Sequence, residues 1–475
     1  MIERPHPVRS LLVLSVAAMA FALAQTSILP ALGELIRVLH TDASGVTWTL
    51  TGYLVSAAVF TPIFGRLGDM FGKRRLLVVA LTMFALGSVV SALGDSLEVV
   101  VAGRVLQGVG GGVFPLCYGI IRDEFPAERV ARSIGLISAI VGIGGGAGLV
   151  FGGLLVDNAS YHWIFWAGGA TAAVAAVLAQ LLVPESPVRT PGRVDVRGAV
   201  VLAAGLVAPL IGVSQAGAWG WMDARTLGLI AAGVAILAAW VALERRTAEP
   251  LADVELLARR PVLMTNVATV LVGFGMFGSF TLLPQLTEAP QSTGYGFGLS
   301  ATELGLLMLP GALVMLFAGP LSGVLGTRRG PRVPLGVGAL IAAVGLSLLA
   351  VDHGSQGAIL VFNTLLSVGI GMAFAAMPNL IVSAVPLERT GEATGFNAVV
   401  RSVGASLGAQ VTASMLAGSA VAGTSVPTDS GFTEAFAIGA VVAALAAVAT
   451  LLIPREGGPG RRRAPVPARP VYAEA

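Results

Sequence analysis

Long apolar stretches alternate with short polar segments along most of the chain. A helix needs roughly 20 apolar residues to cross the hydrocarbon core of a bilayer. A first group of such stretches falls near residues 11–37, 46–67, 76–94, 97–121, 132–157 and 162–183, and two more fall near 197–216 and 225–243. A third group falls near 262–287, 302–325, 333–351, 358–384, 393–420 and 433–453. The pattern predicts about fourteen transmembrane helices.

The order of these stretches predicts an all-α integral membrane protein built from two pseudo-symmetric six-helix bundles and two extra central helices. We expect the N-terminal bundle at residues 1–184 and the C-terminal bundle at residues 261–455. Residues 185–260 would then hold the two additional helices and their cytoplasmic linkers. The Arg- and Pro-rich segment 456–475 is predicted to be a disordered cytoplasmic tail.

The composition excludes a water-soluble protein. Hydrophobic residues make up 55% of the chain and charged residues 12%, whereas soluble domains carry about 25% charge. The single cysteine, Cys117, excludes an intramolecular disulfide. The four histidines fall in tails or loops, so we expect no metal site and no cofactor. No Ser–His–acid set converges inside the membrane, so we do not expect an enzyme.

The basic residues predict the topology. If the N-terminus is cytoplasmic and the stretches alternate, nearly all of the 29 Lys and Arg residues fall in cytoplasmic loops or tails. Gaining or losing one helix would destroy this asymmetry, so an even number of spans with both termini in the cytoplasm is favoured. We therefore expect a multi-pass protein of the plasma membrane, monomeric, with the lipid bilayer rather than nucleic acid around it. Arg104 and Arg401 fall within apolar stretches.

Two matched motifs indicate an internal duplication. The pattern Pro-x-Glu-Arg occurs at residues 126–129 and at 386–389, each time followed by a glycine at the same spacing. A glycine motif at residues 65–72 has a counterpart at 323–330. Each motif occupies the same place within its group of six stretches. Two facing repeats with a substrate bound between them are the architecture of alternating-access transporters; the alternative is a non-transporting receptor.

The loop after the second stretch carries a glycine- and charge-rich motif. Its candidate residues for a conformational latch are Gly65, Asp69, Gly72, Lys73 and Arg74. The glycines allow a tight turn and close helix packing, and Asp69 could pair with a cation or a helix N-terminus on the cytoplasmic face. Alternatively, Asp69 is a solvated loop charge and the cations only set the topology. The second repeat has Thr327 in place of Asp69, so a latch here would be asymmetric. The motif resembles the signature of the major facilitator superfamily.

Two further motifs extend that resemblance. Arg104 and Gln107 lie one turn apart in the fourth stretch, which is similar to a motif of proton-coupled members of the superfamily. The fifth stretch resembles the motif typical of exporters, with Leu149 where that motif usually has proline. Its small residues predict close helix packing. The candidate packing residues are Gly144, Gly148, Gly152 and Gly153.

Together these motifs resemble the fourteen-helix drug:proton antiporter branch of the superfamily, over nearly the whole chain. The resemblance implies export by alternating access in exchange for protons, with spans 1, 4, 9 and 12 facing the cavity. The implied substrate or coupling residues are Gln25, Thr26, Arg104, Gln107, Asn266, Phe274, Phe277, Asn363 and Asn379. These positions are poor in charge, which favours amphipathic cargo such as drugs, antibiotics or secondary metabolites. The alternative is one specific polar metabolite.

The proton route is the point at which the sequence departs from that branch. Many relatives carry an Asp in the first helix, where this chain has Phe21. No Asp, Glu or His falls in the middle of any apolar stretch. We predict that coupling passes through Glu34, near the outer end of the first stretch, with Arg104 as its electrostatic partner. The alternative is that Glu34 is an interfacial carboxylate paired with Arg37.

Overall fold

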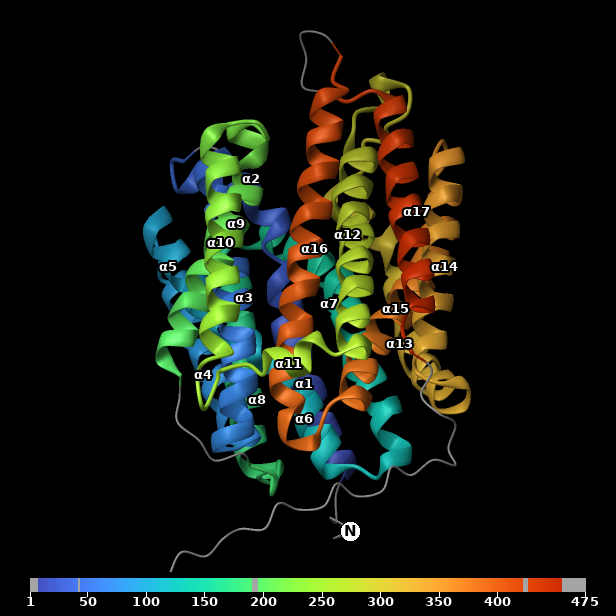
Figure 1. Ribbon diagram of the computed structural model, residues 1–475. Helices are drawn as coiled ribbons and strands as arrows, with labels where there is room; N and C mark the ends of the chain where they lie inside the picture. Colours follow the sequence, from blue (N-terminus) through green and yellow to red (C-terminus); the bar gives the residue numbers. More distant parts are fainter. Residues whose placement is uncertain (1–6, 42, 190–194, 422–425, 455–475) are drawn as a thin grey trace, which may run out of the picture.

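Antiparallel helices make up the N-terminal half of the protein (Figure 1). The computed structural model describes residues 7–41, 43–189, 195–421 and 426–454. The helices of this half are α1 (Pro7–Thr26), η1 (Leu29–Ala31), α2 (Leu32–Val38), α3 (Ala43–Phe71), α4 (Lys73–Ala92), α5 (Leu97–Gly108), η2 (Val109–Gly112), α6 (Val113–Glu124), α7 (Ala127–Asn158) and α8 (His162–Leu182).

The second half follows two additional long helices. These are α9 (Val196–Trp219) and α10 (Ala224–Glu244), after which the short α11 (Val254–Ala258) crosses to the C-terminal half (Figure 1). That half contains α12 (Arg260–Glu288), η3 (Gln291–Thr293), α13 (Ala301–Arg329), α14 (Arg332–Val351), α15 (Gln356–Ala384), η4 (Leu387–Arg389), α16 (Thr390–Gly418) and α17 (Asp429–Leu451). The predicted boundary after residue 184 falls between α8 and α9, and the predicted tail 456–475 lies outside the described residues.

Thirteen helices of the described chain are long and apolar enough to cross a membrane. The fourteenth predicted span, 393–420, corresponds to α16, which falls outside this set although its 29 residues would reach about 43 Å. It is more polar than its neighbours because it carries Glu392, Asn397 and Arg401. The fold is thus the predicted all-α arrangement. The more polar helix, α16, is one that packs against the other half, on α3.

Equivalent turns in the two halves support the duplication. Gly72, between α3 and α4, has φ 114°, and Gly330, between α13 and α14, has φ 91°. Such positive values favour glycine because a side chain would strain the backbone. Ser96 and Ser355 cap α5 and α15 in the same way, each accepting a hydrogen bond from a backbone N–H three residues on.

Each half has its own apolar core, and the halves meet along two helix pairs. The larger clusters of buried apolar residues fall within α1–α8 and within α12–α17. Contacts between the halves come mainly from α7 against α13 and from α3 against α16. At the second pair, α9 touches both halves, because Ser214 bonds to Thr51 (2.7 Å) and its carbonyl accepts from Gln410.

Candidate functional site

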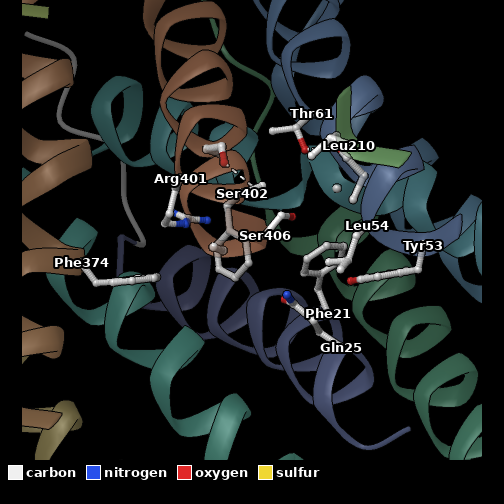
Figure 2. A pocket seen from close by; sticks show the side chains of 15 residues that line it. Phe21, Gln25, Tyr53, Leu54, Thr61, Leu210, Phe374, Arg401, Ser402 and Ser406 are labelled. Carbon is white, nitrogen blue, oxygen red and sulfur yellow. Dashed lines mark hydrogen bonds between the residues drawn. The ribbon is translucent and has the colours of Figure 1, made fainter. Parts of the chain in front are cut away.

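A cavity of about 100 Å³ lies between the two halves. Figure 2 shows side chains reaching it from both halves. The first half contributes α1, α3, η2 and α6, the second contributes α15 and α16, and α9 adds Leu210. The lining residues are Phe21, Gln25, Tyr53, Leu54, Ala57, Thr61, Gly111, Phe114, Leu210, Phe374, Ala398, Arg401, Ser402, Ala405 and Ser406. An apolar wall with a few polar groups is the usual make-up of a small-molecule site.

Arg401 is the one charged residue of this lining. Its guanidinium carbon lies 4.9 Å from the centre of the Phe374 ring, a cation–π geometry. Ser402, on the same helix, donates to the Ala398 carbonyl at 3.0 Å. The Tyr53 hydroxyl, on α3, is buried without a hydrogen-bond partner among the described residues. The cavity therefore combines aromatic surface with one cation and one unpartnered hydroxyl.

Arg104 lies outside this lining, in a network of its own. It is 1% exposed, and its guanidinium lies 4.2 Å from the centre of the Tyr53 ring. Nε donates to the Thr49 carbonyl at 3.0 Å, and Nη1 donates to the Ala24 carbonyl at 3.3 Å and to Gln107 Oε1 at 2.8 Å. Gln107 in turn donates to Ser88 at 2.6 Å. Arg104 and Gln107 thus donate their hydrogen bonds to protein acceptors, next to the Tyr53 ring.

The remaining predicted cargo contacts are dispersed. Gln25 lines the cavity, whereas the neighbouring Thr26 donates to the Gly144 carbonyl at 2.9 Å. Asn363 lines a separate small hollow between α7, α12, α13 and α15. Asn379 donates to the Ala131 carbonyl of α7 at 3.1 Å, which joins the two halves.

On α12, Asn266 accepts a hydrogen bond from Asn397 at 2.8 Å. The backbone of Phe274 abuts Gly408 of α16. The side chain of Phe277 lies outside the described part of the structure. None of these three positions is among the cavity-lining residues. Of the residues predicted to contact cargo, Gln25 lies in the cavity lining, and the other lining residues come largely from α3 and α16.

Glu34 lies on α2, beyond the first membrane span, which ends at Ala31. It is partly buried, and its Oε2 has no hydrogen-bond partner in the described chain. It is not part of the cavity lining, and within the described ranges it forms no ion pair with Arg37 or Arg104. The structure therefore does not bring the two predicted coupling residues together.

The latch residues form a buried charge cluster around the turn between α3 and α4. Asp69 Oδ1 lies 3.3 Å from Lys73 Nζ, and Lys73 Nζ lies 2.7 Å from Asp123 Oδ2. All three side chains are at most 1% exposed. Gly72 makes the intervening turn, and Arg74 pairs with Glu185 at 3.7 Å. The two carboxylates on either side of Lys73 compensate its buried charge.

Asp69 also reaches across to the second half. Its Oδ2 accepts a hydrogen bond of 3.0 Å from the backbone N–H of Glu392, in the first turn of α16. A carboxylate is favoured there by the positive end of the helix dipole. The backbones of Gly65 and Gly391 touch directly, so a Cβ on either residue would collide with the carbonyl of the other. The α3–α16 contact is therefore closed, at the end where α16 begins, by glycines and a charge-assisted bond.

Arg122, at the end of α6, makes a second set of contacts between the halves. It donates to the carbonyls of Val385 (2.7 Å) and Pro386 (3.1 Å) and to the Thr390 hydroxyl (2.6 Å). Glu392 is tied to the linker before α11, because its carboxylate accepts from the backbone of Asp253 at 2.6 Å.

The glycines of α7 pack on α1. A Cβ at Gly144, Gly148 or Gly152 would collide with Ala22, Thr26 or Ser27, respectively. Gly153 is also buried. Their spacing of four residues places Gly144, Gly148 and Gly152 on one face of the helix, where α1 approaches too closely for side chains.

Arg401 and Tyr53 are the cavity residues that sequence reasoning left without a role. Arg401 gave the same signal as Arg104, a cation within an apolar stretch, which marks a functional candidate in a membrane protein. Tyr53 gave no signal, because an aromatic residue in an apolar stretch is ordinary. Glu392 was likewise inconspicuous, since its proximity to Asp69 depends on the packing of helices more than 300 residues apart in the chain.

The chain resembles several characterised transporters. It is 33% identical over 421 residues to the "Tetracenomycin C resistance and export protein" of Streptomyces glaucescens, covering 87% of this chain and 76% of that one. It is 31% identical over 412 residues to the "Uridine/deoxyuridine transporter" of Lactococcus lactis subsp. cremoris, covering 83% and 84%. The proton:xylose symporter XylE shares the fold, with a TM-score of 0.66 at 15% identity, covering 95% of this chain and 96% of that chain.

A family model supplies the assignment. The model described as Major Facilitator Superfamily matches residues 14–409 and 290–473, which together span most of the chain. Its members are transporters rather than enzymes, and they bind small molecules within the lipid bilayer. This chain, with its thirteen apolar helices and duplicated halves, belongs to the major facilitator superfamily.

Proposed function

We propose that this transporter exports small amphipathic compounds, such as drugs, antibiotics or secondary metabolites, across the plasma membrane by alternating access. The observation that carries the proposal is the cavity lined by both halves, with aromatic walls and few polar groups. Similarity to an antibiotic export protein supports the direction of transport. The asymmetry of basic residues supports cytoplasmic termini. The protein would act as a monomer.

The cytoplasmic latch would control access to this cavity. In the conformation described here, Asp69 holds the first turn of α16 and Gly65 meets Gly391, so the halves are joined on the cytoplasmic side. Loading from the cytoplasm requires these contacts to separate. Because each lost contact exposes a group that protein atoms had satisfied, the latch would favour the cytoplasm-closed state until cargo binding compensates.

The experiment that tests export is an efflux assay in a host lacking its own pumps. The panel should contain aromatic antibiotics, dyes and uridine, with equal membrane levels of the transporter verified in each culture. We expect several amphipathic compounds to accumulate less in cells that carry the transporter. If uridine alone is moved, the specific-metabolite function gains support from the nucleoside transporter relative. If no compound is moved, the proposed export is wrong.

Exchange for protons is the second part of the proposal, with Glu34 as the carrier. Glu34 is partly buried, and its Oε2 has no hydrogen-bond partner among the described residues. The test is drug-induced proton release from energised vesicles containing wild type or Glu34→Gln. We expect the variant to lose the exchange. If it exchanges protons for drug at the wild-type ratio, Glu34 is not the carrier, and if wild type moves no protons, antiport is withdrawn.

A further inference from the structure

The two arginines within the membrane-spanning helices have different surroundings. Arg104 donates to two backbone carbonyls and to Gln107. Arg401 forms no hydrogen bond and no ion pair with any described residue, and its charge faces the Phe374 ring. Figure 2 shows the Arg401 side chain beside the cavity, next to Ser402 and Ser406.

The position of Arg401 makes this lack of a partner costly. It is the twelfth of 29 residues in α16, about 17 Å from the cytoplasmic end of the helix. A charge at such depth is expensive unless it pairs or faces a polar cavity. Arginine cannot relieve the cost by releasing its proton, because its pKa is too high. A cation kept at this place is therefore available for an anion that arrives from elsewhere.

The rest of the lining contains no carboxylate that could serve as this anion. The nearby polar groups are Gln25, Thr61, Ser402 and Ser406, which are neutral, and Tyr53, whose hydroxyl has no partner in the described chain. Tyr118 interacts electrostatically with Arg401, but the Tyr118 hydroxyl is hydrogen-bonded to the Ser138 hydroxyl at 3.1 Å. The cavity thus carries a net positive charge from Arg401 alone among its lining residues.

We propose that the cavity recognises amphipathic organic anions: compounds with an aromatic body and one acidic group, either a carboxylate or an ionised phenol or enol. The acidic group binds the guanidinium of Arg401, whose planar fork can donate two parallel hydrogen bonds to a carboxylate. The aromatic body packs against Phe21, Phe114 and Phe374. This assignment rests on the proposed export function and names the charge class of its cargo.

The test compares three naphthalene compounds of nearly the same shape: 2-naphthylacetate, its methyl ester, and 2-naphthylethylamine. They are respectively anionic, neutral and cationic at neutral pH. Binding to the purified full-length protein in detergent is measured by equilibrium dialysis. We expect wild type to bind the carboxylate at least about tenfold more tightly than the ester or the amine, since a charge-assisted bond is lost in both.

Variants then assign the preference to one residue. Arg401→Gln should weaken carboxylate binding at least about tenfold and change ester binding by less than about twofold, while Arg401→Lys should retain part of the preference because it keeps the charge. Arg225→Gln is the matched control, because it removes an exposed arginine that pairs with Asp223 far from the cavity lining. It should leave all three affinities unchanged.

Three results overturn the proposal: wild type binding the ester or amine as tightly as the carboxylate, wild type binding none of the three, or Arg401→Gln retaining the carboxylate preference. If Arg401→Gln does not fold, the wild-type comparison and Arg401→Lys still decide. Failure of the export proposal is a separate result. A transporter that exports neutral or cationic compounds from the efflux panel without preferring the carboxylate keeps its proposed function and loses this cargo assignment.

Discussion

The α3–α16 pair is built in opposite ways at the end where α16 begins and in the middle of the two helices. Where α16 begins, the two backbones touch at Gly65 and Gly391, and the buried Asp69 pairs with Lys73 and accepts a hydrogen bond from the N–H of Glu392. Farther along the same helices, Tyr53 and Arg401 line a cavity and have unused polar groups.

This difference separates residues that hold the two halves together from residues that can bind cargo. Charged groups that pair with protein groups, as Asp69 does with Lys73 and with the N–H of Glu392, stabilise one arrangement of the halves, because separating the halves breaks these contacts. Polar groups that face the cavity without an ion pair have no such preference, and a ligand can supply a partner. Substitutions at the Gly65–Gly391 contact should therefore impair the conformational cycle. Substitutions at Tyr53 or Arg401 should instead change which cargo is bound.

The largest effect is expected at the glycine contact. Gly391→Leu places a side chain against the backbone of Gly65, so the cytoplasmic side cannot close. Overpacking of this kind costs about 1–3 kcal/mol, and the upper value corresponds to a transport loss of about 100-fold. Initial efflux rates at equal membrane levels measure it.

Gly418→Leu is the matched control, since a Cβ at the end of the same helix meets nothing within 4 Å. It should transport like wild type. Equal rates for both variants would contradict the view that this end of α16 must approach α3 closely.

The next effect concerns the hydrogen-bond partners of the two buried arginines, Arg104 and Arg401. Arg104→Gln leaves the carbonyls of Thr49 and Ala24 without their donor, and we expect a loss of about 2 kcal/mol of folding free energy. Arg401→Gln removes a charge that has no hydrogen bond or ion pair among the described residues and contacts only the Phe374 ring there, so stability should be equal or higher. Unfolding titrations of both purified variants measure the contrast. Equal destabilisation would show that Arg401 has a structural partner after all.

A smaller effect is expected at the latch charge. Asp69→Asn keeps a hydrogen-bond acceptor for the N–H of Glu392 but loses the ion pair with Lys73, which retains Asp123. Transport should slow about tenfold, equivalent to about 1.4 kcal/mol, with normal insertion. The control is Thr327→Asn at the equivalent position of the second half, where the hydroxyl bonds only within its own helix. A wild-type rate for Asp69→Asn would mean that the charge does not hold the latch.

The smallest effect is expected at the cavity hydroxyl. Tyr53→Phe keeps the ring that lies beneath Arg104 and removes a buried hydroxyl without a partner. Stability should be unchanged or slightly higher, while affinity for cargo with a hydrogen-bond acceptor should fall about threefold, as for one weak hydrogen bond. Affinities of wild type and variant for an exported aromatic ketone and its deoxygenated analogue measure it. An equal loss for both compounds would place the effect in ring packing.

The sequence alone determined the membrane fold and its duplication. Apolar stretches of bilayer length dictate helices, because the lipid core offers no other partner for backbone N–H and C=O groups. The matched glycines at positions 72 and 330 indicated two equivalent turns, and both glycines have positive φ. The α16 stretch was recognisable despite its polar residues, since it keeps the length of a span. The glycines of α7 were recognisable as packing residues from their spacing.

The tertiary structure alone decided which polar residues meet. Arg104 and Arg401 gave the same signal in sequence, but carbonyls from α1 and α3 surround Arg104, whereas Arg401 faces a cavity. Asp69 was a candidate to pair with a cation or a helix N-terminus, but only the structure shows that this N-terminus is that of α16, at the backbone N–H of Glu392. The reason is physical: hydropathy and spacing fix each helix by local interactions, while the partner of a buried charge depends on which helices pack together across the whole chain.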